Sequence, residues 1–356
     1  MANIKEFVKA INKKYGDTTM TKGSSKLQDC ERIPTGIFPL DLALGGGFPM
    51  GAISEVYGPE SSGKTNIALK AIATHQKMYP DLKCIFVDVE HAFDGPWAAK
   101  MGVDVENLEI VSPDNADQIV DMVEGLMGVD DCGLIVVDSI AAMASTSELK
   151  KDAGTLQVGG NSVVVGQLIK KAMIAQSAAA KHERYPTLIC INQIRFKIGV
   201  MFGDPETTPG GNALRFYAKL RMRCYGKNES IKEVSATMPA FKKTSVVIKK
   251  WKVPIVAVNC EYLMAMIPHS GLHIGELEDW NTVCTYGKNY GLITQQKGGW
   301  GLDGKVYPTL TAMKEAVRTN FDLGMALKQE IINLAAQDAN GTPLEFHEAG
   351  EPTTPD

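Results

Sequence analysis

The sequence predicts an α/β protein built on a mainly parallel central sheet. Between Ile33 and about Arg223, short apolar segments alternate with longer segments of helical period, as in parallel sheets covered by helices. A glycine-rich turn over residues 58–65 joins one apolar segment to one helical segment, as in phosphate-binding loops. The chain has 356 residues, 44% of them apolar, and this length suggests about two domains.

An amphipathic helix is predicted at the start, over residues 3–15. Apolar side chains recur on one face, Asn3 and Glu6 form a capping motif, and Gly16 ends the helix. A polar stretch, 17–28, separates it from the rest of the chain. Periodicity alone leaves two alternatives open, since the apolar face can pack on its own domain or on a neighbouring copy.

The central region contains five predicted strands of the parallel type with helices between them. These strands are Ile53–Tyr57, Cys84–Val89, Leu108–Val111, Leu134–Val137 and Leu188–Asn192, and the clearest helices are Thr65–Tyr79 and Ala116–Met127. Residues 219–267 contain strand-like segments without long helices between them, which predicts an antiparallel extension of the sheet. Those segments are Leu220–Tyr225, Ser245–Lys250 and Val256–Met266.

A smaller mixed α/β segment follows from about Gly271, with helices predicted at Thr311–Asn320 and Phe321–Ala336. The last residues carry carboxylates and prolines without Lys or Arg, which is typical of a disordered acidic tail. We therefore expect an N-terminal helix and linker (1–32), a core (33–270), a small C-terminal domain (271–336) and a tail (337–356).

Composition narrows the class of protein. The formal net charge of −4 argues against a protein that is basic all over, although a local basic groove remains compatible with it. Seven cysteines are spread singly, which favours reduced thiols in the cytoplasm over a disulfide framework. No apolar run reaches the roughly 18–20 residues of a membrane span. His269 and His273 are separated by Gly271, so we expect no histidine metal site there.

The strongest motif is a phosphate-binding loop that follows a predicted strand and opens a predicted helix. It reads Gly58, Pro59, Glu60, Ser61, Ser62, Gly63, Lys64 and Thr65. Backbone N–H groups and the helix N-terminus can hold phosphates. Lys64 would reach the β- and γ-phosphates of ATP, and the Thr65 hydroxyl would bind Mg²⁺.

Two predicted strands end in carboxylates. Asp138 follows the apolar run 134–137 and suits a second Mg²⁺ ligand. Asp88 and Glu90 lie two residues apart at the end of another strand and share a face. Glu90 can orient and deprotonate a water molecule at this edge, or it can be a solvated strand end.

The long segment IRFKIGVMFGDPETTPGGN, residues 194–212, has no helical or strand period. A loop of this length inside a compact domain is usually functional. Basic side chains lie in it and after it: Arg195, Lys197, Arg215, Lys219, Arg221 and Arg223. Its glycines permit close approach of a phosphate backbone, and Phe196 can stack on bases. These features favour a loop that contacts a polyanion over a lid on the nucleotide.

Four segments together resemble the bacterial RecA recombinase family: GPESSGKT (58–65), VDVEHAFD (87–94), LIVVDS (134–139) and the stretch 192–218. The similarity runs from about residue 5 to about residue 330. It is typical of a diverged member, and the sequence leaves open whether a host or a phage encodes it. The fold that the resemblance implies is a RecA-type P-loop ATPase core with an N-terminal docking helix.

The resemblance implies roles for residues around the nucleotide. Lys64, Thr65 and Asp138 match the residues that hold phosphate and Mg²⁺, and Glu90 matches the glutamate that activates water. Gln193 matches the glutamine that senses the γ-phosphate and relays its state to the loop.

Further roles concern adenine and the neighbouring subunit. Asp94 and Trp97 match the adenine contacts, with Trp97 where the family commonly has Tyr. Lys250 and Lys252 match a lysine pair that reaches the ATP of the adjacent subunit, although a solvated strand edge is the plain alternative. The N-terminal helix matches the family's docking helix, which favours the neighbouring copy as its partner.

The resemblance also implies two DNA-binding loops. Residues 194–211 match the second, and the expected contacts are Arg195, Phe196, Ile198, Gly210, Gly211 and Asn212. Residues 151–163 lie where the family has the first loop but depart from its pattern, with Val158 in place of a methionine and Val163 in place of an arginine. Lys170 keeps a positive charge at another contact position.

The function implied is ATP-dependent homologous recombination. The chain would polymerise on single-stranded DNA into a helical filament, pair it with double-stranded DNA and exchange strands, with DNA-stimulated ATP hydrolysis. The cofactors would be ATP and Mg²⁺, and single-strand-binding and mediator proteins are open as partners. A ring helicase, a P-loop kinase and a non-catalytic DNA scaffold are the rival hypotheses.

Overall fold

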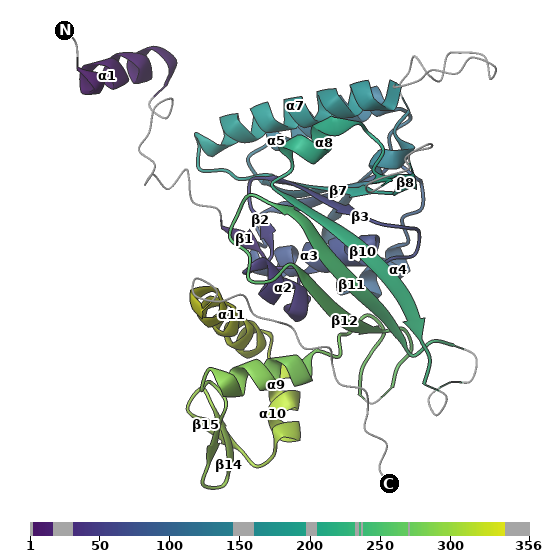
Figure 1. Cartoon of the computed structure of the whole chain (residues 1–356), viewed down its shortest axis with the longest axis vertical. Coiled ribbons are helices and arrows are strands. Elements are labelled where there is room, and N and C mark those ends of the chain that lie inside the picture. Colours follow the sequence, from purple (N-terminus) through teal and green to yellow (C-terminus); the bar gives the residue numbers. More distant parts are fainter. Residues whose placement is uncertain are drawn as a thin grey trace.

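The structure is a computed structural model that describes residues 3–16, 31–144, 160–196, 205–231, 235, 238–269 and 271–338. An eight-stranded sheet forms its centre, with the strand order β12-β11-β10-β3-β7-β6-β4-β5 (Figure 1). This arrangement confirms the predicted α/β fold with a mainly parallel central sheet.

The parallel part of the sheet consists of β3 (Ile53–Tyr57), β4 (Lys83–Asp88), β5 (Leu108–Val111), β6 (Cys132–Asp138) and β7 (Thr187–Asn192). These strands have short, nearly continuous apolar runs, which suit strands buried on both faces. Every residue of β3 and β7 is buried. All five strands overlap the predicted segments.

The antiparallel extension is also as predicted. Strand β10 (Leu220–Glu229) pairs parallel with β3 and antiparallel with β11 (Phe241–Trp251), which in turn pairs with β12 (Asn259–Ala265). Strands β10 and β11 are longer than the apolar pattern indicated, and β12 is shorter. Exposed residues 226–228 continue β10, and half-buried Lys242 and Lys243 lie in the added part of β11.

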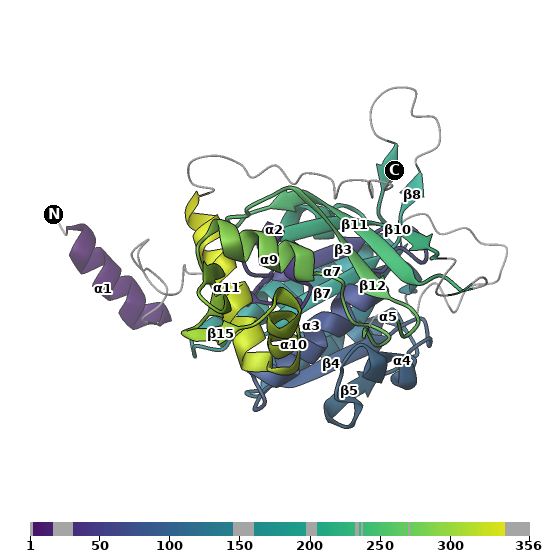
Figure 2. The same ribbon diagram turned by 90° about the horizontal axis from the view of Figure 1, so that it is seen from below.

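Helices cover both faces of the sheet (Figures 1 and 2). On one face lie α2 (Phe38–Leu44), α3 (Lys64–Met78) and α4 (Gly95–Lys100), whose buried side chains share an apolar cluster with the sheet. On the other lie α5 (Ala116–Met127), α7 (Gly160–Ala180) and α8 (Asn212–Tyr217), which share a second cluster. Two short 3-10 helices, Val105–Asn107 and Ile140–Ala142, and the strand pair β1 (Arg32–Ile33) and β2 (Phe48–Pro49) complete the core.

A small C-terminal domain packs against the first face. It contains α9 (Trp280–Asn289), β13 (Thr294–Gln296), β14 (Gly299–Leu302), β15 (Lys305–Tyr307), α10 (Leu310–Thr319) and α11 (Phe321–Asp338). Its apolar cluster includes Phe38 and Leu42 of α2, so this domain shares core side chains with the sheet layer. The two helices predicted here are confirmed by α10 and α11.

Helix α1 (Ile4–Tyr15) lies apart from the remainder of the described chain in Figure 2. The predicted capping box is present, because the Asn3 side chain accepts from the Glu6 backbone N–H and the Glu6 carboxylate accepts from that of Asn3. None of its residues is buried, and Phe7 is 53% exposed. The apolar face therefore lacks a partner among the described residues of this protomer.

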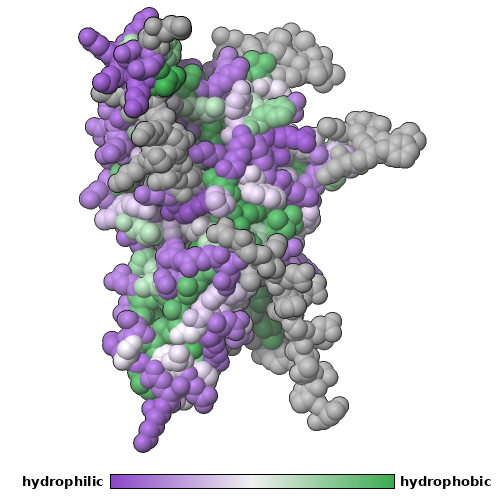
Figure 3. All heavy atoms as spheres, turned by 60° about the vertical axis from the view of Figure 1, so that its left-hand side comes forward, coloured by the Kyte–Doolittle hydropathy of each residue, from purple (hydrophilic) through white to green (hydrophobic). Residues whose placement is uncertain are grey.

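The surface is mixed in character. In Figure 3 hydrophilic residues are spread over the whole visible face and hydrophobic residues gather in small patches. Among the described helices, none combines the length and apolar character needed to cross a membrane.

Candidate nucleotide and DNA-binding site

The predicted phosphate-binding loop lies between β3 and α3, as its motif requires. Gly63 is the N-cap of α3 and has a φ of 92°, a conformation that favours glycine. Gly58 is needed for a different reason, since a Cβ there would overlap the carbonyl oxygen of Cys224 on β10. The loop is thus pressed against the neighbouring strand, with its helix N-terminus free to face an anion.

Lys64 is buried in this loop, with 8% of its surface exposed. Its amine donates to the carbonyl oxygens of Gly58 and Pro59, at 3.2 and 2.7 Å. Burial lowers the pKa of Lys64, while nearby acidic groups, including Asp138 and Glu90, oppose that shift. The lysine is therefore held over the curve of the loop, where a phosphate would lie.

Thr65 and Asp138 meet at the end of β6. The Thr65 hydroxyl donates to Oδ2 of Asp138 at 2.7 Å. Burial raises the pKa of Asp138 to about 6, with the Thr65 hydrogen bond acting in the opposite direction. A hydroxyl and a carboxylate side by side are the oxygen ligands that Mg²⁺ takes together with phosphates. The described residues contain no cluster of three or more His, Cys, Asp or Glu that could hold a metal by themselves, so the fit is to Mg²⁺ bound with a nucleotide.

Glu90 belongs to a chain of side chains that leads to the long loop. The Ser139 hydroxyl donates to Oε1 of Glu90, and Gln193 Nε2 donates to the same oxygen at 3.3 Å. Gln193 in turn accepts from Arg195 through Oε1 at 3.2 Å. The carboxylate predicted to act on water and the first arginine of the predicted DNA loop are therefore separated by one side chain.

Asn192, the last residue of β7, joins the nucleotide loop to the long loop. Its carbonyl accepts from the backbone N–H of Gly58 at 3.3 Å. Its side-chain amide donates to Glu55 at 2.9 Å and to the carbonyl of Pro209 at 3.1 Å. One buried residue thus contacts both the nucleotide loop and the long loop. It begins the stretch 192–218, but the sequence alone assigned it no role of its own.

Two arginines near the base of the long loop form ion pairs within the protein, although the sequence pattern favoured them as contacts for a polyanion. Arg221 is paired with the fully buried Glu55, and Arg223 binds both carboxylate oxygens of Glu206 at 2.7–2.9 Å. Both arginines are 8% exposed. The sequence pattern placed both among the basic residues available to a polyanion. Instead, Arg223 binds Glu206 of the loop, and the charge of Arg221 is matched by Glu55 of β3.

The ends of the long loop form a short strand pair that the sequence did not predict, β8 (Arg195–Phe196) with β9 (Glu206–Thr207). Gly210 and Gly211 have φ values of 87° and 69° and lie against Val165 and Ser162 of α7. Arg195, Phe196 and Asn212 are exposed. The predicted contact Ile198 lies outside the described residues.

The first predicted DNA loop is described only at its end. Residues 151–159, including Val158, lie outside the described residues, whereas Val163 and Lys170 are exposed on α7. Asn161 at the start of α7 donates to the carbonyls of Ile140 and Met143, at 3.2 and 2.7 Å. The flanks of both loops therefore meet beside the segment that follows Asp138.

Asp94 and Trp97 lie together beside the nucleotide loop. Asp94 caps α4 by accepting from the backbone N–H of Trp97 at 2.9 Å. The indole N–H of Trp97 donates to Oδ1 of Asn66, the residue after Thr65, at 3.0 Å. The partly buried ring is thus oriented by α3 itself, a contact that the motif did not reveal.

Lys250 and Lys252 lie at the far end of β11, away from Lys64. The Lys250 amine donates to the carbonyls of Arg215 and Phe216, both at 2.7 Å, and the Lys252 amine donates to that of Phe216 at 3.3 Å. Burial, with Lys252 as the next cause, lowers the pKa of Lys250 to about 8. The pair caps the last turn of α8, which is a favourable place for cations.

The fold and the geometry of the site identify the class of protein. A strand–loop–helix with a buried lysine, a paired Thr and Asp, and a strand-end glutamate connected to a long loop are the parts of a P-loop ATPase. The sequence model of the RecA N-terminal domain matches residues 2–266. A Protein RecA from Bacteroides thetaiotaomicron is 38% identical over 89% of this chain and 92% of its own. One from Porphyromonas gingivalis is 37% identical over 90% of both chains.

The chain therefore belongs to the RecA family, whose members are DNA-dependent ATPases that act in recombination. This confirms the resemblance seen in the four sequence segments. A solved structure of the RadB recombinase matches 65% of this chain with 21% identity and a TM-score of 0.47, too distant a match to add to the assignment.

Proposed function

We propose that this protein binds ATP and Mg²⁺ at residues 58–65 with Asp138, polymerises on single-stranded DNA into a helical filament, and exchanges strands with double-stranded DNA. The carrying observation is the hydrogen-bonded chain from Glu90 through Gln193 to Arg195. Such a chain gives ATP and DNA a common element on which both can act, as coupling between sites requires.

The roles of individual residues follow from their positions. Lys64 and the backbone N–H groups of the loop would hold phosphates, while Thr65 and Asp138 would hold Mg²⁺, which neutralises developing charge on the phosphates. Glu90 would orient the attacking water and accept its proton. Asp94 and Trp97 would contact adenine, with the ring stacked on the base.

Gln193 would act as the switch. Its side-chain N–H donates to Glu90, and its side-chain oxygen accepts from Arg195. A γ-phosphate that competes for this amide would therefore break or redirect both hydrogen bonds. The loop whose predicted contacts are Arg195, Phe196, Ile198 and 210–212 would then change its position on DNA. Lys250 and Lys252 would contact the ATP of the next subunit, and α1 would dock on it.

The domain limits and the surroundings belong to the same proposal. We infer an N-terminal helix and linker (1–32), a core (33–270), a C-terminal domain (271–336) and an acidic tail (337–356), in a cytoplasmic protein. Single-strand-binding and mediator proteins are candidate partners.

The deciding experiment compares ATP hydrolysis with and without single-stranded DNA in the wild type, Lys64→Ala, Glu90→Gln and Gln193→Ala. We expect DNA to stimulate only the wild type strongly. Lys64→Ala should lose ATP binding, whereas Glu90→Gln should bind both ligands without turnover. Gln193→Ala should hydrolyse ATP at a low rate that DNA does not change.

A strand-exchange assay and electron microscopy with an ATP analogue complete the test. Open filaments and exchanged strands are expected. Closed rings that unwind duplex would identify a helicase instead, and hydrolysis that ignores DNA in the wild type would contradict the proposed coupling.

A further inference from the structure

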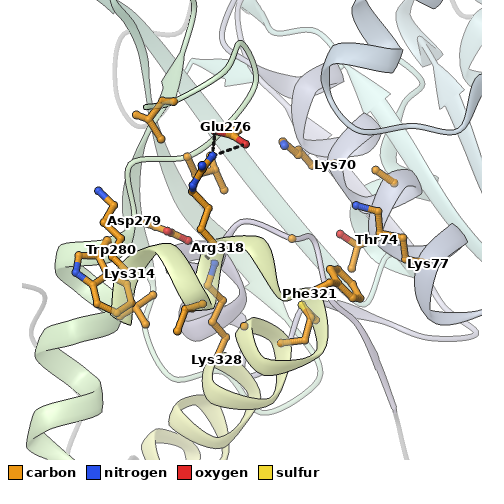
Figure 4. Close-up of a pocket in the computed structure, with 18 of the residues that line it drawn as sticks. Lys70, Thr74, Lys77, Glu276, Asp279, Trp280, Lys314, Arg318, Phe321 and Lys328 are labelled. Atoms are coloured by element: carbon orange, nitrogen blue, oxygen red, sulfur yellow. Dashed lines mark hydrogen bonds and ion pairs between the residues drawn. The ribbon is translucent and has the colours of Figure 1, made fainter. Parts of the chain in front are cut away.

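A cavity of about 270 Å³ lies between α3 and the C-terminal domain, away from the nucleotide loop (Figure 4). One wall is formed by Lys70, Thr74 and Lys77, which follow one another on successive turns of α3. The opposite wall comes from α9, α10, α11 and the segment that precedes α9. The cavity therefore spans the contact between the ATPase core and the C-terminal domain.

The far wall has its charges paired. Arg318 lies 3.3 Å from Glu276, and Lys328 lies 2.7 Å from Asp279. Lys314 is 3.5 Å from Glu278. The acidic groups that face the cavity are thus already engaged by cations of the C-terminal domain.

The α3 wall has unpaired cations. Among the residues that the structure describes, Lys70 and Lys77 have no carboxylate within ion-pairing distance. The Lys77 amine lies 5.1 Å from the ring centre of Phe321, and Lys70 is partly buried with its amine directed toward the side of Glu276 (Figure 4). Two amines on one helix face repel each other unless an anion lies between or beside them.

The remaining lining is apolar, with Leu272, Trp280 and Val317 among its residues. Ligand sites commonly combine such walls with a few convergent polar groups, and the volume of this cavity, just below the usual range of ligand pockets, suits a small ligand. A small organic body with one compact, strongly charged group matches both features. Lysine ammonium groups bind phosphate as point charges and need no planar partner.

We propose that this cavity is a binding site for a small phosphate-bearing anion, which Lys70 and Lys77 hold and which bridges α3 to the C-terminal domain. The site is separate from ATP turnover and rests on no part of the proposed DNA mechanism. Because α3 begins at Lys64, an anion held at its other end would tie the nucleotide helix to the C-terminal domain.

The protonation of Lys70 supplies a specific signature. Burial lowers its pKa to about 8; Lys77 and Lys328 act in the same direction, while Glu276 and Asp279 oppose it. Arg318 and Lys314 complete the charged groups around the cavity. An anion would favour the ammonium form, so binding near pH 8 should take up protons and should weaken as the pH rises further.

The test uses the full chain carrying Lys64→Ala, which weakens phosphate binding at the nucleotide loop, and it omits DNA. The probes for isothermal titration calorimetry are phenyl phosphate, inorganic phosphate and pyrophosphate. In this background we compare Lys70→Gln, Lys77→Gln and Lys70→Arg with a control substitution, Lys297→Gln. Lys297 is an exposed residue outside this cavity, so its substitution removes the same charge.

We expect about one equivalent of probe to bind to the Lys297→Gln protein. Lys70→Gln should weaken binding at least tenfold, Lys70→Arg should restore most of it, and the heat at pH 8 should depend on the buffer's ionisation enthalpy. Phenyl phosphate binding more tightly than phosphate would identify an organic ligand; equal affinity would identify the free anion.

Two outcomes would overturn the proposal. One is equal affinity in Lys70→Gln and Lys297→Gln, and the other is no binding at millimolar probe. Circular dichroism and urea unfolding of each variant separate a lost site from a lost fold, and Lys70→Arg keeps the test valid if Lys70→Gln does not fold. Either negative result leaves the ATP and DNA proposal unaffected.

Discussion

At the scale of single residues, the proposed adenine site depends on a contact between helices. Trp97 is tied to α4 through its backbone and to α3 through its indole N–H, which donates to Asn66. The Asn66 amide also reaches the sulfur of Met264 at 3.7 Å. A ring fixed at two points loses little further freedom when a base stacks on it, so Asn66 is a positioning residue.

We predict that Asn66→Ala raises the KM for ATP about threefold to tenfold with little change in kcat, because the loss of one orienting hydrogen bond is worth about 1 kcal/mol. Steady-state hydrolysis on single-stranded DNA measures both constants. Trp97→Phe removes the indole N–H, so adding Asn66→Ala to it should cost little more. Additive effects of the two substitutions would contradict a role for Asn66 that acts through Trp97.

Some residues of the candidate site could be predicted from the sequence, and others could not. Lys64, Thr65 and their loop were predictable because a contiguous motif specifies them, and Asp138 and Glu90 because they follow apolar strands. Asn66, Ser139 and Asn192 were missed because their partners lie 31, 49 and 137 residues away. No local pattern encodes such contacts, and only the order of strands in the sheet brings them together.

At the scale of elements, β10 is both a sheet strand and the anchor of the long loop. Arg221 and Arg223 share one face of the strand; the first pairs with Glu55 on β3 and the second with Glu206 on β9. The Arg223 guanidinium also stacks 3.6 Å from the ring centre of Tyr225. The alternation of side chains along one strand therefore holds the base of the loop in a fixed position.

We expect Arg223→Gln to destabilise the protein by about 1–3 kcal/mol, since breaking a largely buried pair leaves the other charge without its partner. Single-stranded DNA affinity should fall, while affinity for an ATP analogue is kept. Urea unfolding and fluorescence anisotropy measure these quantities. The double substitution Glu206→Gln with Arg223→Gln should destabilise the protein by less than the sum of the two single substitutions. If the two losses in free energy of unfolding simply add, the side chains do not form a direct pair.

The packing of α3 on the sheet predicts a dependence on pH. His75 is 1% exposed, its Nδ1 lies 3.3 Å from the Cys84 sulfur, and burial lowers its pKa to about 4. The folded state thus binds a proton less readily than the unfolded state, whose histidine pKa is about 6.5. Stability from this residue is complete above about pH 6.5 and is lost as the pH falls toward 4.

The expected loss over that range is about 3 kcal/mol. Urea unfolding of the wild type and of His75→Gln at several pH values isolates the contribution of His75 to the free energy of unfolding. The comparison uses the change of that free energy with pH, which the packing cost of the substitution does not affect. Parallel slopes in the two proteins would mean that His75 does not titrate between these values.

At the scale of the whole molecule, the alternation of strands and helices was enough to predict the sheet and its antiparallel extension, but not the order of its strands. Strand β3 lies between β7 and β10, which are more than 130 residues away in the chain. The C-terminal domain was predictable as a unit, but its shared core with α2 was not, because Phe38 and Leu42 precede it by over 200 residues.

The arrangement of α1 gives the clearest expectation for assembly. This helix has a complete cap and an apolar face, yet buries none of its residues in the protomer. Amphipathic helices gain most of their stability from packing of that face. An apolar stripe without a partner among the described residues of its own chain is accounted for if a second copy of the chain covers it.

Removing residues 1–30 should therefore change the free energy of unfolding of the monomer by less than about 1 kcal/mol, because the deleted helix makes no buried contact with the core. The same deletion should abolish assembly on single-stranded DNA, as measured by sedimentation with an ATP analogue. Phe7→Ser should weaken assembly in the full chain, whereas Lys9→Ser, on the opposite face of the helix, should not. Assembly that survives the deletion would show that the subunits are joined through the core alone, and α1 would then need another partner.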